Sequence, residues 1–133
     1  MSNDSVERFL AVGSFAVVGA SSNRDKYGNK VLRCYQQHDL PVVGVNPRLD
    51  ECEGAKCYPA IDQIPGEPRA VSVVAPPAFA KDVVAAAHRA GVKHLWFQPG
   101  AEDDDAIAEA QRLGIEVIAH GACVLVVLGF RDV

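Results

Sequence analysis

The 133-residue sequence has no long hydrophobic run, no surplus of positive charge and no signal-peptide pattern. Its apolar runs fall short of the roughly 18–20 residues that cross a bilayer. The opening MSNDSVERFL carries two acids where a signal peptide would be basic. The formal net charge is −4, whereas general nucleic-acid binders carry an excess of lysine and arginine. We therefore expect a cytoplasmic protein that binds neither membranes nor nucleic acid.

Disulfide and metal-ligand motifs are also absent. The four cysteines include no CxxC pair, and Cys52 and Cys57 have no second pair of ligands near them, as a zinc site would require. We interpret all four as reduced, structural thiols. The acidic run at 102–105 is interpreted as the start of a helix, because carboxylates stabilise the positive end of a helix dipole. We expect no bound metal ion.

The two common nucleotide-binding fingerprints are missing as well. In the loop GASSNR, Ser21 and Arg24 stand where the second and third glycines of G-x-G-x-x-G would be. The acid that holds the ribose of NAD after the second strand is replaced by the residues Asn46, Pro47 and Arg48. No G-x-x-x-x-G-K-[ST] motif occurs, which argues against nucleotide hydrolysis. These absences disfavour an NAD site and leave open a different phosphate-bearing ligand.

The sequence does contain a regular alternation of apolar runs and helical patterns. Five short runs rich in valine and isoleucine are typical of strands buried on both faces of a parallel sheet; they span residues 15–19, 41–45, 70–74, 94–98 and 115–119. Helices are predicted over residues 4–12, 28–38, 77–90 and 102–113. In the third helix, Phe79 shares a face with Val83, Val84 and Ala87. Residues 47–69 are expected to be irregular, with one helical turn at 59–64, and residues 121–130 to form a last buried helix or strand.

This alternation predicts a three-layer, doubly wound α/β fold of the Rossmann-like type. Short connections between strands and helices favour right-handed βαβ units. We expect a five-stranded, mostly parallel sheet in the order 3-2-1-4-5, with helices on both faces. Residues 1–133 are predicted to form a single domain, in which the N-terminal segment 1–12 is a helix packed outside the sheet.

In such a sheet the ligand crevice lies at the carboxyl ends of the strands, beside the first strand. The loop after that strand offers a tight turn at Gly19, hydroxyl and amide donors at Ser21 and Ser22, and then the start of a helix. Four cations are expected near this crevice, namely Arg24, Lys26, Lys30 and Arg48. They predict an anionic ligand, although a solvated basic rim is the alternative.

Six stretches, taken in their order and spacing, resemble the small CoA-binding proteins of bacteria and archaea: VVGASSN (17–23), VVGVNPR (42–48), GAKCYPAIDQIP (54–65), VSVVAPPA (71–78), GVKHLWFQPGA (91–101) and GIEVIAHGAC (114–123). The fold of that family is similar to the CoA-binding domain of the succinyl-CoA synthetase α subunit and of ADP-forming acyl-CoA synthetases. The chain departs from the family in its apolar continuation VLVVLGF. It also stops before the synthetase domain that carries a phosphorylatable histidine, so His120 is not given that role.

The resemblance implies that the crevice holds coenzyme A or an acyl-CoA. The first loop would cradle the CoA phosphates, Arg48 would approach the nucleotide phosphates, and residues after the later strands would line the adenine, its ribose or the site's edge. The implied cofactor-binding residues are Gly19, Ala20, Ser21, Ser22, Asn23, Arg24, Asn46, Pro47, Arg48, Val74, Ala75, Pro76, Phe97, Gln98 and Pro99.

No catalytic constellation stands out near this crevice. Cys123, His120, Asp25 and Tyr27 are the candidates, but no Ser-His-Asp order or paired-carboxylate spacing accompanies them. We therefore predict a protein that binds CoA or acyl-CoA without evident catalysis. The alternatives are a small NAD(P)- or nucleotide-dependent enzyme, a CoA-using subunit completed by a partner chain, and an interaction module. A homodimer or an unknown protein partner is left open.

Overall fold

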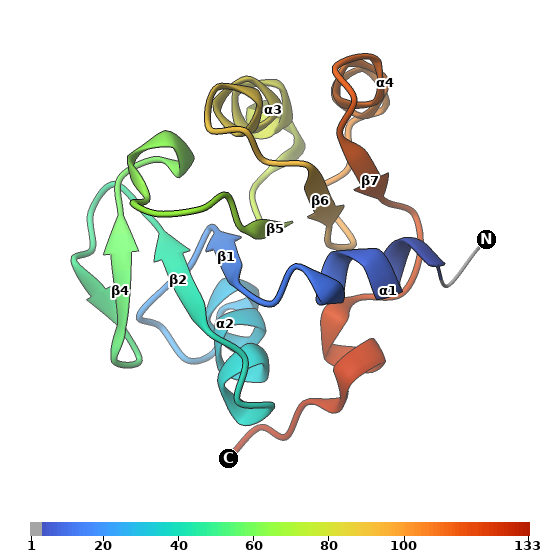
Figure 1. Cartoon of the computed structure of the whole chain (residues 1–133). Helices are drawn as coiled ribbons and strands as arrows, with labels where there is room; N and C mark the ends of the chain where they lie inside the picture. Colours follow the sequence, from blue (N-terminus) through green and yellow to red (C-terminus); the bar gives the residue numbers. More distant parts are fainter. Residues whose placement is uncertain (1–3) are drawn as a thin grey trace.

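A computed structural model describes residues 4–133 as strands and helices arranged around one sheet (Figure 1). All five predicted strands are confirmed, and they are mutually parallel: β1 (Phe15–Val18), β2 (Val42–Val45), β5 (Ala70–Val73), β6 (His94–Phe97) and β7 (Glu116–Ile118). The fold is therefore α/β and Rossmann-like with a mostly parallel sheet, as the alternation predicted. Residues 1–3 of the expected N-terminal segment lie outside the described residues.

The predicted strand count and strand order are wrong. The sheet has seven strands in the order β3-β4-β2-β1-β5-β6-β7, because the region 47–69 contains β3 (Glu51–Cys52) and β4 (Ala55–Tyr58). β4 pairs parallel to β2, and β3 pairs antiparallel to β4. The third predicted strand, β5, pairs with β1 rather than lying outside β2. When β4 is counted as the third parallel strand, the six parallel strands lie in the order 3-2-1-4-5-6. The strand order therefore reverses next to β1, which makes this position the topological switch point of the sheet.

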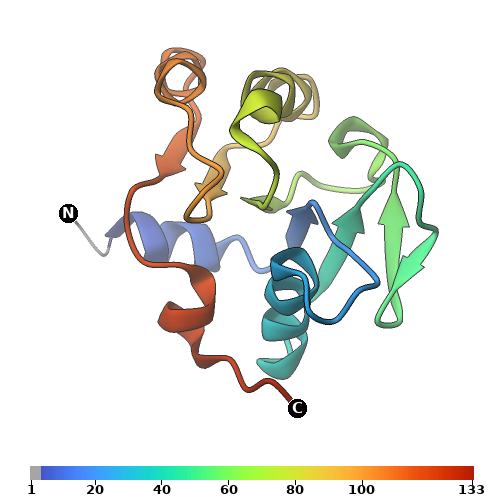
Figure 2. The ribbon, with the colours of Figure 1, turned by 180° about the vertical axis from the view of Figure 1, so that it is seen from behind.

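Helices cover both faces of the sheet. α3 (Ala80–Arg89) and α4 (Asp104–Arg112) lie together on one face, and α2 (Tyr27–Gln37) and α1 (Asp4–Ala11) lie on the other, with α1 beside β7 (Figures 1 and 2). Each face has its own apolar cluster. The cluster beneath α1 and α2 includes Phe15, which stacks on Phe9 and on Tyr35 with ring centroids 5.7 and 4.8 Å apart. These buried rings anchor both helices to the central strand β1.

The helix ends follow the local chemistry. Asp103 caps α4, because its Oδ2 accepts a hydrogen bond from the Ala106 amide at 2.9 Å, so the interpretation of the acidic run as a helix start is confirmed. Gly91 and Gly114 lie just past α3 and α4 with φ of +76° and +85°, the conformation that ends a helix. The placement of Phe79 on a buried helix face is wrong. It belongs to the 3₁₀ turn η2 (Pro77–Phe79) before α3 and is 55% exposed.

The last segment is less buried than expected. Residues 125–129 form a single π-type turn, η3 (Leu125–Gly129), in which no residue is buried and Val126 is 73% exposed. From there the chain runs alongside α2 to its end (Figure 2). The helical turn predicted at 59–64 is confirmed as η1 (Ile61–Gln63). No helix within residues 4–133 is both long and apolar enough to cross a membrane.

Candidate functional site

A cavity of about 430 Å³ opens at the carboxyl ends of β1, β2, β4 and β5. A second cavity of about 240 Å³ lies on the other side of residues 74–76, towards the end of β6. Both are therefore at the switch-point edge of the sheet, where ligands of doubly wound folds bind. The combined space is of the size that small-molecule and cofactor sites have in proteins.

The larger cavity is lined almost entirely by apolar side chains. Only Asn46 and Asp82 bring polar side chains to it. The remaining lining residues are Val18, Gly19, Val45, Pro47, Pro59, Ala60, Ile61, Val74, Ala75, Pro76, Phe79, Val83 and Ala86. A surface of this kind suits the flat or aliphatic part of a ligand, with the two polar groups available to orient it.

The loop between β1 and α2 is held by two glycines. Gly19 has φ of +92°, and a Cβ there would lie 1.9 Å from the Val74 carbonyl oxygen. A Cβ on Gly28 would likewise lie 1.9 Å from the Gly19 carbonyl oxygen. Only glycine fits at these two positions, because the loop lies too close to the end of β5 and to the first turn of α2 to leave room for a Cβ. Gly28 was not singled out from the sequence because it lies nine positions after Gly19, outside the G-x-G-x-x-G window.

Side chains turn the carbonyl groups of this loop inward. The Asn46 Nδ2 donates to the Ala20 carbonyl oxygen at 2.8 Å, and the Asn29 Nδ2 donates to the Ser21 carbonyl oxygen at 2.8 Å. Because N–H and C=O point in opposite directions across a trans peptide, the Ser21 and Ser22 amides point away from those two asparagines. Neither amide donates a hydrogen bond to any of residues 4–133. Two adjacent outward amides of this kind are suited to an anion.

The start of α2 adds to this positive character. The N-cap residue, Lys26, is extended, no described side chain caps the helix, and its first turn holds no acid. The amide groups at the amino end of a helix carry partial positive charge and attract anions. The loop and the helix start thus place free amide groups next to one another, with the exposed Asp25 as the acid between them.

The four predicted cations divide into two pairs. Arg24 is ion-paired with Glu53 at 2.6 Å, and Lys30 with Asp132 at 3.6 Å. By contrast, Lys26 and Arg48 are exposed and make no ion pair within the described chain. The Arg48 amide donates to the Asn46 Oδ1 at 2.8 Å, so Arg48 adjoins a residue that lines the cavity.

The fifteen predicted site residues fall into three groups: those that line a cavity, those in or around the loop, and those that are buried. Those that line one of the two cavities are Gly19, Asn46, Pro47, Val74, Ala75, Pro76 and Pro99. Ser21 is half-buried in the loop, while Ser22, Asn23, Arg24 and Arg48 are exposed around it. Ala20, Phe97 and Gln98 are fully buried and line neither cavity. Gln98 accepts the Val124 amide at 2.9 Å and donates to the Ser72 Oγ at 3.4 Å, so its side chain joins the last segment to the sheet.

Residues 13–129 match the model of a family described as a CoA binding domain. The chain belongs to this CoA-binding domain family. It is 32% identical over 89 residues to the α subunit of an ADP-forming acetate–CoA ligase II from Pyrococcus furiosus, covering 66% of this chain and 20% of that protein. An ADP-forming acetate–CoA ligase I from Archaeoglobus fulgidus is 25% identical over 123 residues, covering 85% and 18%. The chain thus spans about a fifth of the length of these curated relatives.

Solved structures include both a small and a large neighbour of this CoA-binding domain. A conserved hypothetical protein from Pyrococcus furiosus is 39% identical with a TM-score of 0.80, and the match covers 85% of this chain and 97% of that one. The dinucleotide-forming acetyl-coenzyme A synthetase 1 of Ca. Korarchaeum cryptofilum, in complex with phosphate and ADP, is 27% identical with a TM-score of 0.76. There the match covers 89% of this chain and 27% of the enzyme.

Several lining residues of the CoA-binding domain were not predicted from the sequence. Pro59, Ala60 and Ile61 follow β4, and they were missed because that strand was not predicted. The alternation of apolar Ala55 and Cys57 with polar Lys56 is the sequence signal that could have found it. Phe79 and Asp82 were missed because residues 77–90 were treated as one regular helix.

Burial raises the pKa of a tyrosine that lines the smaller cavity and of two cysteines. Burial and a hydrogen bond with Cys123 raise the pKa of the Tyr27 hydroxyl above its usual range. Burial raises the pKa of Cys34 and of Cys52 to about 11, so both thiols are protonated and unreactive near neutral pH. His120 lies at the surface, 3.0 Å from the Asp104 carboxylate. No cluster of three or more metal-ligating side chains occurs in the described part of the chain.

Proposed function

We propose that the chain binds CoA or an acyl-CoA across the two cavities and the β1–α2 loop. One observation carries the proposal: an apolar cavity lies directly beside a loop whose Ser21 and Ser22 amides make no hydrogen bond within residues 4–133, in a chain of the CoA-binding domain family. CoA combines an adenine ring and a long neutral arm with three phosphate groups. The site offers a separate surface for each kind of group.

The apolar cavity would hold the adenine ring. Phe79 is 55% exposed and lines the cavity together with Pro59 and Pro76, so it presents an aromatic face to a flat ligand. Base–aromatic stacking contributes about 1–3 kcal/mol. The Asp82 carboxylate is an acceptor suited to the exocyclic amine of adenine.

The phosphates would lie over the loop and the start of α2. The amides of Ser21 and Ser22 and the helix N-terminus supply donors without requiring a bound cation. Lys26 and Arg48 are exposed cations of this region that make no ion pair within residues 4–133. Arg48 adjoins Asn46 at the cavity wall, so we assign it to the 3′-phosphate of the ribose.

Calorimetric titration with CoA, dephospho-CoA, NAD and ATP tests the proposal. CoA should bind most tightly, and removal of the 3′-phosphate should weaken binding. Arg48→Ala should weaken CoA binding about tenfold, as the loss of a charge-assisted hydrogen bond implies, and more strongly at low salt. Arg112→Ala is the matched control, because it removes the same charge at the far end of α4. Binding of NAD without binding of CoA would contradict the proposal.

A second candidate is the CoA-holding part of an acyl-CoA synthetase completed by another chain. The observation that favours it is that these two curated relatives, both acetate–CoA ligases, are about three to five times as long as this chain. If this candidate holds, a partner copurified with the chain should form acetyl-CoA from acetate, ATP and CoA, and neither component should do so alone. Absence of synthesis by the combined chains would count against it.

A further inference from the structure

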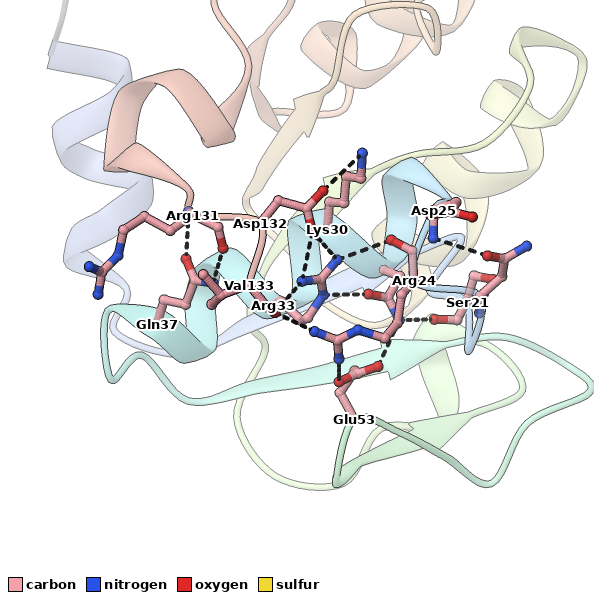
Figure 3. A network of polar contacts seen from close by, with 12 residues as sticks. Ser21, Arg24, Asp25, Lys30, Arg33, Gln37, Glu53, Arg131, Asp132 and Val133 are labelled. Carbon is pink, nitrogen blue, oxygen red and sulfur yellow. Dashed lines mark hydrogen bonds and ion pairs between the residues drawn. The ribbon is translucent and has the colours of Figure 1, made fainter.

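Two buried polar residues of α2, Asn29 and Arg33, join the phosphate loop to parts of the chain distant in sequence. Asn29 is fully buried and Arg33 is 4% exposed. Around them lie the β1–α2 loop, the β3–β4 hairpin and residues 130–133, which we call the closing segment. Figure 3 shows Arg33 between Arg24 of the loop and Asp132 of the closing segment.

Asn29 forms the inner half of this cluster. Its Nδ2 donates to the Ser21 carbonyl oxygen at 2.8 Å and to Glu53 Oε2 at 3.1 Å, and its Oδ1 accepts from Arg33 Nε at 2.6 Å. The Asn29 amide and the Arg24 guanidinium hold the pKa of the Glu53 carboxyl below its usual range. The orientation of the Ser21 peptide, and with it the Ser22 amide, is therefore held by Asn29, which Arg33 keeps in place, and by Cys52, whose Sγ donates to the same carbonyl oxygen at 2.8 Å.

Arg33 forms the outer half, and each of its five N–H groups has a partner. Nε donates to Asn29, and Nη2 donates to the Arg24 carbonyl oxygen at 3.0 Å and to Asp132 Oδ1 at 3.2 Å. Nη1 donates to Asp132 Oδ1 at 3.3 Å and to the Val133 carbonyl oxygen at 3.4 Å. The guanidinium also lies 5.1 Å from the centre of the Phe130 ring. Three of these six contacts thus come from Asp132 and Val133, and one more from Phe130.

Asp132 of the closing segment is the carboxylate that hydrogen-bonds Arg33, and Glu53 interacts with Arg33 electrostatically. A guanidinium can remain buried only when its charge and its hydrogen bonds are satisfied. Asp132 supplies the carboxylate, and its own side chain is 60% exposed, so it can leave the cluster readily. Once Asp132 leaves, Arg33 gains by turning towards water. Turning would release the Arg24 carbonyl and the Oδ1 of Asn29.

We propose that Arg33 is a positioning residue for the phosphate loop, and that Asp132 of the closing segment sets the fraction of molecules in which the Ser21 and Ser22 amides face the ligand. This inference rests on the proposed function. When only a fraction of the molecules is competent, the apparent dissociation constant rises in inverse proportion to that fraction. The closing segment thereby determines CoA affinity without touching the cavities.

Asp132→Asn tests this inference, because it removes the charge and keeps the size of a half-exposed side chain. Within 20–26, hydrogen exchange of the hydrogen-bonded amides of Asn23, Asp25 and Lys26, measured without ligand, should become faster. CoA affinity should fall about three- to tenfold. Asp132→Glu should restore both. Glu116→Gln is the matched control: it breaks a similar arginine–carboxylate pair, with Arg8, between α1 and the edge strand β7, and should change neither readout.

The two readouts separate this inference from the proposed function. If the parent chain fails to bind CoA, the proposed function is wrong, and faster exchange at 20–26 in Asp132→Asn still supports the role of the closing segment. If exchange at 20–26 is the same in Asp132→Asn and in the parent, the inference is overturned, even where CoA binds. Unfolding midpoints of all variants exclude a general loss of stability as the cause.

Discussion

Replacement of Gly28 by alanine sets two physical effects against each other. Gly28 is the second residue of α2, where alanine is favoured over glycine by about 1 kcal/mol of helix propensity. However, the added Cβ would lie 1.9 Å from the oxygen and 2.8 Å from the carbon of the Gly19 carbonyl. Both atoms belong to the backbone, so no rotamer change relieves the overlap. Propensity predicts a more stable protein, and the overlap predicts a less stable one.

The overlap should exceed the gain in propensity. An ordinary carbon–oxygen contact is about 3.4 Å, so the loop must move about 1.5 Å from α2. Gly19 cannot simply retreat, because the space at its own α-carbon is blocked by the Val74 carbonyl. Overpacking of this kind costs about 1–3 kcal/mol, and a site closed on two sides belongs at the upper end. After the gain of about 1 kcal/mol in propensity, we expect Gly28→Ala to lower the free energy of unfolding by about 1–2 kcal/mol.

Urea denaturation at fixed pH measures this difference, with the slope of the transition compared between variants. Ala108→Gly, at an exposed position of α4, measures the propensity difference in this protein alone and should cost about 1 kcal/mol. Calorimetry should also show weaker CoA binding by Gly28→Ala, since the displaced loop carries the Ser21 and Ser22 amides. A Gly28→Ala protein as stable as the parent, with the same slope and the same CoA affinity, would refute this account of the loop.

Three further predictions follow from exposure and charge. Hydrogen bonding from Arg8 lowers the pKa of Glu116, so the pair stabilises the fold above the usual glutamate range. The contribution of this pair to stability should vanish as the pH falls through the lowered pKa of Glu116. The difference in unfolding free energy between the parent and Glu116→Gln should therefore shrink between pH 7 and pH 3. A constant difference would contradict the pairing. Cys123 is half-buried, whereas the other three cysteines are buried and have raised pKa values. An alkylating reagent at pH 8 should therefore label Cys123 first, as measured by peptide mapping. Equal labelling of all four cysteines would argue against the fold. Phe79→Ala should weaken CoA binding about tenfold by loss of stacking with little change in the unfolding midpoint, whereas Val126→Ala, at another exposed apolar position, should leave the affinity unchanged.

The strands that the sequence revealed are those covered on both faces. β1 and β5 are short runs of small and branched apolar residues, almost wholly buried, and such runs stand out in a sequence without any partner. β4 alternates buried Ala55 and Cys57 with exposed Lys56, because only the two-residue strand β3 lies beyond it. A polar residue at every second position, with glycine and proline on either side, made the region look irregular. That one omission changed both the predicted strand order and the predicted cavity wall.

Topology alone was enough to predict which residues share one edge of the sheet. Carboxyl ends of neighbouring parallel strands must meet at one edge, and this brought Asn46 and the residues at 74–76 to the same cavity. Topology does not determine where long cationic side chains point, because their direction depends on partners that are distant in the sequence. Arg24 and Lys30 turn towards Glu53 and Asp132, and nothing in the neighbouring sequence of either cation indicates this.

The absence of the G-x-G-x-x-G fingerprint is therefore compatible with the phosphate-binding loop that we propose. In G-x-G-x-x-G, glycines let the backbone approach a diphosphate and let the helix pack against the strand. Here the close packing is at Gly28 rather than at the third glycine position, and the loop carbonyls are held by Asn46 and Asn29. With those carbonyls held inward, the amides of Ser21 and Ser22 face outward without a second glycine. A loop built in this way depends on residues from β2, α2 and the closing segment, so a search for a local motif does not detect it, whereas substitution of the distant anchors should disable it.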